Sequence, residues 1–183
     1  MKSPSCLLAL ILILLQGCIM NKSEEIPQKV LIKTEPQDTL PRVTGIGGIF
    51  FKGNNPDSLN NWYSQQLGIN VSEHGAPFEF RNGNNPDEVN YLIWAVHDSS
   101  TSYMNPSEAP FMINYRVQHI EKLVDRLAKN GTKIIDTIAD YPYGKFVHVL
   151  DPEGNILELW EPIDSVLTAI GGETTKLVDL VTF

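Results

Sequence analysis

The feature that most constrains the fold is a pattern that occurs twice, with a period of roughly 64 residues. In each half an apolar strand is followed by an amphipathic helix and then by three further strands. One such unit would leave a curved sheet with bare edges, so two units are expected to pair around a cleft. The pattern predicts an α+β fold of two tandem βαβββ modules that form a curved mixed sheet. The predicted elements are 46–51, 59–67, 70–74, 77–81 and 91–97 in the first half, and 111–117, 120–127, 133–138, 145–150 and 156–160 in the second.

The last strand of the second half carries an unusual carboxylate. Asp151–Pro162 reads as a turn that leads into a strand, with Pro152 and Gly154 as turn residues. Alternation along the strand places Glu158 on the same face as Ile156 and Trp160. A carboxylate among apolar groups is costly unless it is paired, protonated or bound to a ligand. Glu158 is therefore a candidate functional residue.

Two segments carry a resemblance to a known family. The stretch Asp151–Pro162, and the first-helix stretch 62–68 with sequence WYSQQLG, resemble the glyoxalase/bleomycin-resistance/dioxygenase family, also called the vicinal oxygen chelate (VOC) superfamily. The resemblance covers about residues 43–162 and implies modules at 43–98 and 110–162. It agrees with the βαβββ repeat, which rests on independent features of the sequence. Residues 163–183 extend beyond the usual family end and, because they are apolar, are expected to pack as an extra helix, over the sheet or against a neighbour.

The resemblance also implies four positions for metal ligands, usually His or Glu, two from each module. Glu158 matches the position in the last strand. Because a divalent ion needs several such ligands, the sequence does not favour a metal, and it places glyoxalase-type isomerisation in doubt. The other three positions fall on Gly47 or Gly48, on Met112 or Asn114, and near Trp94.

A ligand site without a metal is suggested by aromatic residues on or beside the predicted strands. The bleomycin-resistance branch of the resembled family implies a metal-free, aromatic-lined groove, and such walls suit a planar or amphipathic molecule. The alternative is that these aromatics fill the core, and that Glu158 pairs with Lys145, Arg116 or a tyrosine hydroxyl. His74, His97 and His119 are expected at the surface or as satisfied strand residues. The predicted ligand-binding residues are Trp94, Tyr115, Tyr143 and His148, and Tyr141 and Trp160 also flank the expected cleft.

The N-terminal segment reads as a targeting signal. Leu7–Leu15 is an apolar run too short to span a bilayer, which needs about 20 residues, and it fits a signal peptide. Leu15-Gln16-Gly17-Cys18 looks like a bacterial lipobox, although Gln16 is uncommon there. The prediction is a signal peptide at 1–17, a lipidated Cys18 with a polar tether over 18–42, and a membrane-anchored lipoprotein of the cell envelope. An ordinary signal peptide or an uncleaved anchor is the alternative.

Charge and motifs narrow the function. The net charge of −8 and the absence of a basic stripe argue against nucleic-acid binding, and no other catalytic signature occurs. The leading prediction is an exported VOC domain that binds a small organic molecule, with a homodimer as one possible assembly. Two alternatives stay open. One is a metal-dependent lyase or dioxygenase that uses Glu158 with His148, and the other is an envelope scaffold that uses residues 163–183.

Overall fold

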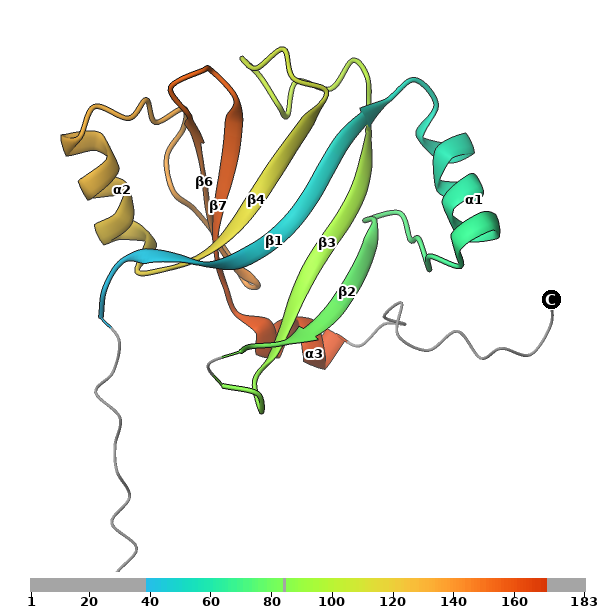
Figure 1. Cartoon of the computed structure of the whole chain (residues 1–183), viewed down its shortest axis with the longest axis horizontal. Helices are drawn as coiled ribbons and strands as arrows, with labels where there is room; N and C mark the ends of the chain where they lie inside the picture. Colours follow the sequence, from blue (N-terminus) through green and yellow to red (C-terminus); the bar gives the residue numbers. More distant parts are fainter. Residues whose placement is uncertain (1–38, 84, 171–183) are drawn as a thin grey trace, which may run out of the picture. The chain divides into compact units, whose positions relative to one another are not determined.

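Two antiparallel strands, β1 (Arg42–Gly53) and β4 (Phe111–Gln118), form the centre of a seven-stranded mixed sheet (Figure 1). The computed structural model describes residues 39–83 and 85–170. The strand order is β2-β3-β1-β4-β7-β6-β5, which confirms the predicted α+β class and mixed sheet. The remaining elements are α1 (Pro56–Leu67), β2 (Ala76–Arg81), β3 (Val89–Asp98), α2 (Ile120–Lys129), β5 (Ala139–Tyr141), β6 (Gly144–Leu150), β7 (Ile156–Pro162) and α3 (Asp164–Ile170).

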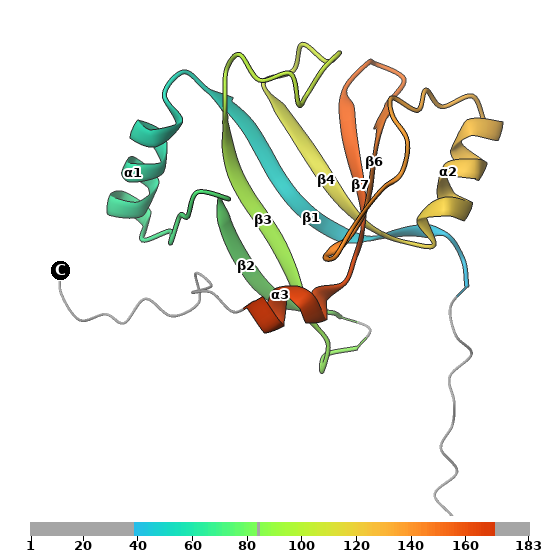
Figure 2. The ribbon, with the colours of Figure 1, turned by 180° about the vertical axis from the view of Figure 1, so that it is seen from behind.

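The internal duplication is visible in the strand pairing. β1 pairs in parallel with β3, the last strand of its own half, and β4 pairs in parallel with β7 in the same way. Each first strand therefore lies between its own half and the other half. This arrangement joins the two modules into one sheet, with α1 beside one module and α2 beside the other (Figures 1 and 2).

Two predicted strands do not form. Residues 70–74 make only an isolated bridge between Ser72 and Gly75, because Gly75 has a φ of 95° and the two residues exchange backbone hydrogen bonds in a tight turn. Residues 133–138 make only the bridge between Ile134 and Val149, because the Asp136 side chain accepts the His148 backbone N–H at 2.8 Å and interrupts the ladder. In the second half, the short strand β5 follows this segment.

The two long helices form in the predicted segments, but α1 begins three residues earlier and α2 ends two residues later than predicted. At α1 the Asn55 side chain caps the helix by accepting from the Ser58 backbone N–H at 2.9 Å, Pro56 stands at its start, and Gly68 closes it in the left-handed conformation. The apolar stripe of α2, which includes Ile120 and Leu123, packs with the β4, β6 and β7 side chains Val117, Val147 and Leu159 in a buried cluster. We call the face of the sheet covered by α1 and α2 the helix face.

A third, short helix follows β7. α3 contacts β3 and lies close to one end of the sheet in both views (Figures 1 and 2). Residues 164–170 thus form a packed helix, and an extra helix is one of the alternatives expected for the C-terminal extension. The described residues include no helix with the length and apolar character needed to cross a bilayer. The predicted signal peptide, Cys18 and most of the tether lie outside the described residues, as does 171–183.

Candidate functional site

The face of the sheet opposite α1 and α2 holds a large open cavity of about 1730 Å³. Both modules line it, β2 and β3 on one side and β6 and β7 on the other. Ile156, Glu158 and Trp160 of β7 all line the cavity, so the predicted alternation along this strand is confirmed. The loop between β3 and β4 contributes Tyr103, and α3 contributes Leu167 and Thr168.

The polar part of the cavity is built around the Glu158 carboxylate, and Glu158 is 1% exposed. The carboxylate accepts hydrogen bonds from the Tyr103 hydroxyl and from Asn114 Nδ2. His148 Nε2 lies 3.2 Å from Glu158 Oε1, and His148 Nδ1 lies 2.7 Å from Asp136 Oδ2. These five residues are called the Glu158 group. Pairing with a tyrosine hydroxyl was one of the expected alternatives, whereas Lys145 pairs with Glu121 and Arg116 pairs with Asp164.

Strand register brings this group together. Glu158 is directly opposite Asn114 on β4 and opposite His148 on β6. The three side chains share the cavity face because directly paired residues project to the same side of a sheet. His148 Nε2 faces the Glu158 carboxylate, whereas the buried Asn114 Oδ1 has no hydrogen-bond partner. A buried polar atom without a partner is costly, so the group leaves one acceptor, Asn114 Oδ1, unsatisfied.

Burial and the Glu158 charge have opposite effects on the pKa of two histidines, and the net direction differs between them. Burial would lower the pKa of His148, but pairing with Glu158 and Asp136 outweighs burial and raises it. At His97 burial prevails over the attraction of Glu158, and the pKa is lowered. Burial and the Glu158 carboxylate both raise the pKa of Tyr103, so its hydroxyl remains a donor. His148 of the Glu158 group therefore favours the cation, whereas His97 favours the neutral form.

The His148 pairing predicts a pH dependence of stability. Because the folded-state pKa is raised above 6.5, protonated His148 stabilises the fold fully below pH 6.5, and this contribution is lost as the pH rises through the folded-state pKa. The His148→Gln variant should lack this step in a series of urea unfolding curves measured against pH. His74→Gln, which alters an exposed histidine, is the control and should keep it. Identical profiles for all three proteins would contradict the pairing.

Four aromatic side chains, called the aromatic wall, line the side of the cavity formed by β5, β6 and β7. Tyr141 and Tyr143 are stacked with ring centroids 5.5 Å apart, and Phe146 stacks on Trp160 at 5.6 Å. Phe146 also makes edge contacts with both tyrosines. The two tyrosines are exposed, whereas Trp160 is 3% exposed. The wall therefore runs from the open rim of the cavity to its floor.

The lining of the cavity is acidic. It includes Glu79, Asp136 and Glu158, and no lysine or arginine occurs among the described residues that line it. The lining thus offers several hydrogen-bond acceptors and only neutral or histidine donors. An anionic ligand would find no lysine or arginine among these lining residues while α3 is in place.

The residues at the implied metal positions do not fit a divalent ion. Gly47 lines the cavity, and a side chain at this position would meet Asn114 Oδ1 at 2.2 Å, so there is no room for a ligand. Met112 is buried in an apolar cluster, and both oxygens of Glu158 already have partners. Within 39–83 and 85–170 there is no group of three His, Cys, Asp or Glu side chains placed to hold a metal.

Comparison with known families decides the relationship. The model of the Glyoxalase/Bleomycin resistance protein/Dioxygenase superfamily matches residues 49–159, which is more than half of the chain. The chain belongs to this superfamily. No curated protein matches it.

Several solved structures are similar to the chain at low identity. Methylmalonyl-CoA epimerase from Streptomyces coelicolor, in complex with 2-nitronate-propionyl-CoA, is 12% identical, with 67% of this chain and 99% of that chain covered and a TM-score of 0.48. The same enzyme from Mycobacterium tuberculosis is 17% identical, with coverages of 69% and 93% and a TM-score of 0.43. The Mn(II)-bound glyoxalase from Novosphingobium aromaticivorans is 14% identical, with coverages of 67% and 40% and a TM-score of 0.47. Membership of the superfamily rests on the family model.

The predicted site residues of this superfamily member divide between the two faces of the sheet. Glu158, His148 and Tyr143 line the cavity. Trp94 does not, because it projects to the helix face and packs on Tyr63 of α1 with ring centroids 4.6 Å apart. Tyr115 also projects to the helix face, against the cluster under α2. The predicted placement of Trp94 and Tyr115 in the cleft was therefore wrong. The faces of a strand alternate with each residue, so an error of one residue moves a side chain to the other face of the sheet.

Two members of the Glu158 group were not predicted from the sequence. Tyr103 lies in a polar loop, and the signal that could have drawn attention to it is a single aromatic residue among serines and threonines. Asp136 lies in a segment expected to be a regular strand, and its role depends on the interrupted pairing with β6. Asn114 is one of the two residues, with Met112, at a metal-ligand position that the family resemblance implies.

Proposed function

We propose that this superfamily member is an exported, lipid-anchored domain that binds a small planar organic molecule in its cavity. The observation that carries the proposal is the open cavity of about 1730 Å³ with an aromatic wall on one side and the Glu158 group at its polar end. Ligand sites are typically concave, largely apolar and equipped with a few polar groups that orient the ligand. The aromatic wall supplies stacking surface, and the Glu158 group supplies orientation.

Binding is favoured over metal-dependent lyase or dioxygenase chemistry because of the donor set. Glu158 is held by Tyr103, Asn114 and His148, so a metal would have to displace existing partners. The scaffold alternative uses residues 163–183, of which 171–183 lie outside the described residues.

The cavity lining indicates the chemistry of the ligand. The lining includes the carboxylates of Glu79, Asp136 and Glu158 and the side-chain oxygen of Asn114, which accept hydrogen bonds. A planar, uncharged molecule that carries an N–H or O–H donor fits this set, since it can stack on the wall and donate to the polar end.

Calorimetric titration of the full chain with 2-naphthamide tests the proposal. This probe has a planar bicyclic ring and an amide donor, and its size is consistent with a Kd of about 10–100 µM. Its saturated analogue, decahydro-2-naphthamide, should bind about 10-fold more weakly or worse because it cannot stack. Absence of binding, or equal binding of both compounds, would argue against an aromatic ligand site.

Export and lipidation are part of the proposal and rest on the lipobox-like stretch that ends at Cys18. In cells fed labelled palmitate, the wild-type chain should incorporate label and fractionate with membranes. Cys18→Ser should lose both, whereas Cys6→Ser should keep both because Cys6 precedes the expected cleavage point. Label that persists in Cys18→Ser would show that lipidation occurs elsewhere.

A further inference from the structure

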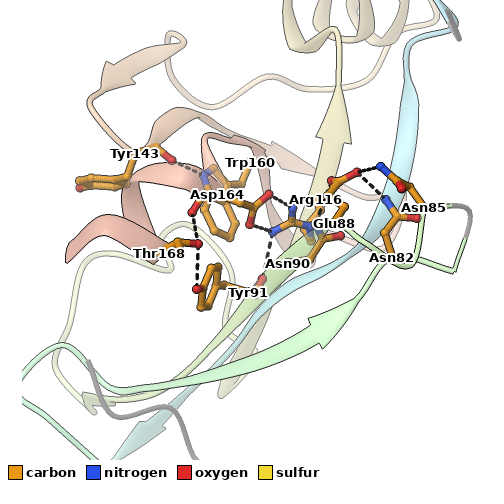
Figure 3. Close-up of polar contacts among 10 residues, drawn as sticks. All are labelled: Asn82, Asn85, Glu88, Asn90, Tyr91, Arg116, Tyr143, Trp160, Asp164 and Thr168. Atoms are coloured by element: carbon orange, nitrogen blue, oxygen red, sulfur yellow. Dashed lines mark hydrogen bonds and ion pairs between the residues drawn. The ribbon is translucent and has the colours of Figure 1, made fainter. Parts of the chain in front are cut away.

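A buried arginine lies behind the aromatic wall of this cavity, whose described lining contains no lysine or arginine. Arg116 is 3% exposed. An arginine is almost never buried to this extent unless a charged group pairs with it. Its Nη1 donates to Asp164 Oδ1 and to the Tyr91 carbonyl oxygen, each at 3.0 Å, and its Nη2 pairs with Asp164 Oδ2 (Figure 3). The guanidinium therefore grips a carboxylate with two parallel bonds, the geometry in which arginine binds carboxylates most strongly.

The guanidinium lies next to residues that line the ligand cavity. Its central carbon lies 5.2 Å from the Trp160 ring centroid, and Trp160 belongs to the aromatic wall. Its side-chain stem approaches Gly47, which lines the cavity. A planar ligand on the wall would thus place a carboxylate substituent within reach of Arg116 if Asp164 were absent.

Asp164, the residue that pairs with the guanidinium, is the first residue of α3. It lies beyond the part of the chain that matches the superfamily (49–159). α3 has seven residues, too few to be stable by itself. Leu167 and Thr168 project into the cavity, and Thr168 Oγ1 lies 3.0 Å from the Tyr91 hydroxyl (Figure 3). α3 thus fills part of the cavity, and its Asp164 neutralises the nearby cation.

We propose that Arg116 is a carboxylate-binding residue of this cavity, that Asp164 occupies its site in cis, and that a planar ligand bearing a carboxylate takes that place by displacing α3. The inference rests on the proposed function, because it adds a second ligand class, planar carboxylates, to the same cavity. It explains why a cavity without lysine or arginine in its lining has an arginine buried directly behind its wall.

Titration of two full-chain variants with matched probes tests the inference. The probes are 2-naphthoate and 2-naphthamide, which share a ring and differ in charge. Asp164→Ala should bind naphthoate at least 10-fold more tightly than the wild type, with naphthamide affinity changed less than about threefold. Thr168→Val loosens α3 but leaves Asp164 on Arg116, so it should show no gain for naphthoate. Asp164→Asn should behave like Asp164→Ala and serves if the alanine variant does not fold.

Equal gains in affinity for both probes would indicate that the substitution only enlarged the cavity, and would overturn the carboxylate site. The absence of any gain in naphthoate affinity would overturn it as well. A measurement on the wild type gives an independent answer. Millimolar naphthoate should increase hydrogen exchange at the backbone amides of 164–169, whereas naphthamide should not; unchanged protection would show that α3 is not displaced. Naphthamide binding to the wild type tests the proposed function separately, so the two can fail independently.

Discussion

Glu158→Ala is expected to lower the free energy of unfolding by about 2–3 kcal/mol, since the change leaves several buried polar groups without a partner. Asn114 is 2% exposed and would lose the acceptor of its Nδ2 group. Tyr103 would also lose its acceptor, but its exposed ring allows water to replace the carboxylate. The expected loss therefore comes mainly from Asn114 and His148.

Urea unfolding of Glu158→Ala beside Glu153→Ala measures this effect. Glu153 lies in the turn that precedes β7 and is exposed, so its replacement should change stability by less than about 0.5 kcal/mol. If Glu158→Ala proved as stable as the control, the carboxylate would contribute nothing to the fold. If it proved more stable, Glu158 would be a strained group kept for catalysis or metal binding, and its role as a satisfied polar anchor of the cavity would be refuted.

Trp160→Leu is expected to weaken 2-naphthamide binding by about 10-fold or more. Trp160 forms the inner part of the aromatic wall, where it stacks on Phe146 and donates from Nε1 to the Tyr143 carbonyl oxygen at 3.2 Å. Its loss removes the ring on which Phe146 stacks and the hydrogen bond that supports Tyr143. The fold should also lose about 2–4 kcal/mol, because a large buried side chain is truncated.

Trp94→Leu is the matched control. Trp94 is similarly buried, at 9% exposed compared with 3% for Trp160, but it packs on the helix face against Phe51 and Tyr63. Its replacement should reduce stability to a similar extent and leave naphthamide affinity within about threefold of the wild type. A larger loss of affinity in Trp94→Leu than in Trp160→Leu would show that the ligand binds on the helix face instead.

The architecture could be predicted from the sequence because its signals are local and repeated. The Asn55 cap, the stripe of α2 and the turn at Gly154 each fix an element through neighbours close in the chain. The duplication then limits how the two halves can pair. The short segments at 70–74 and 133–138 were wrongly predicted because one tight turn and one side chain that accepts a ladder N–H decide their conformation.

The site was only partly predictable because it depends on register and on distant residues. The alternation in β7 was enough to predict that Glu158 lines the cavity. Trp94 and Tyr115 were assigned to the wrong face of the sheet, because the prediction was in error by one residue of register. Tyr103 lies 55 residues from Glu158 in the chain. The pairing of Arg116 with Asp164 joins residues 48 positions apart, and no local pattern indicates such contacts.

Native mass spectrometry of the full chain, purified from an exporting bacterial host, tests ligand binding without a metal most directly. We expect a chain without a bound divalent ion that gains the mass of one organic ligand, either carried from the host or supplied as 2-naphthamide. Trp160→Leu should lose that adduct, and Trp94→Leu should keep it. One divalent ion per chain, removed by a chelator and absent from Glu158→Gln, would contradict metal-free binding and establish a metal site.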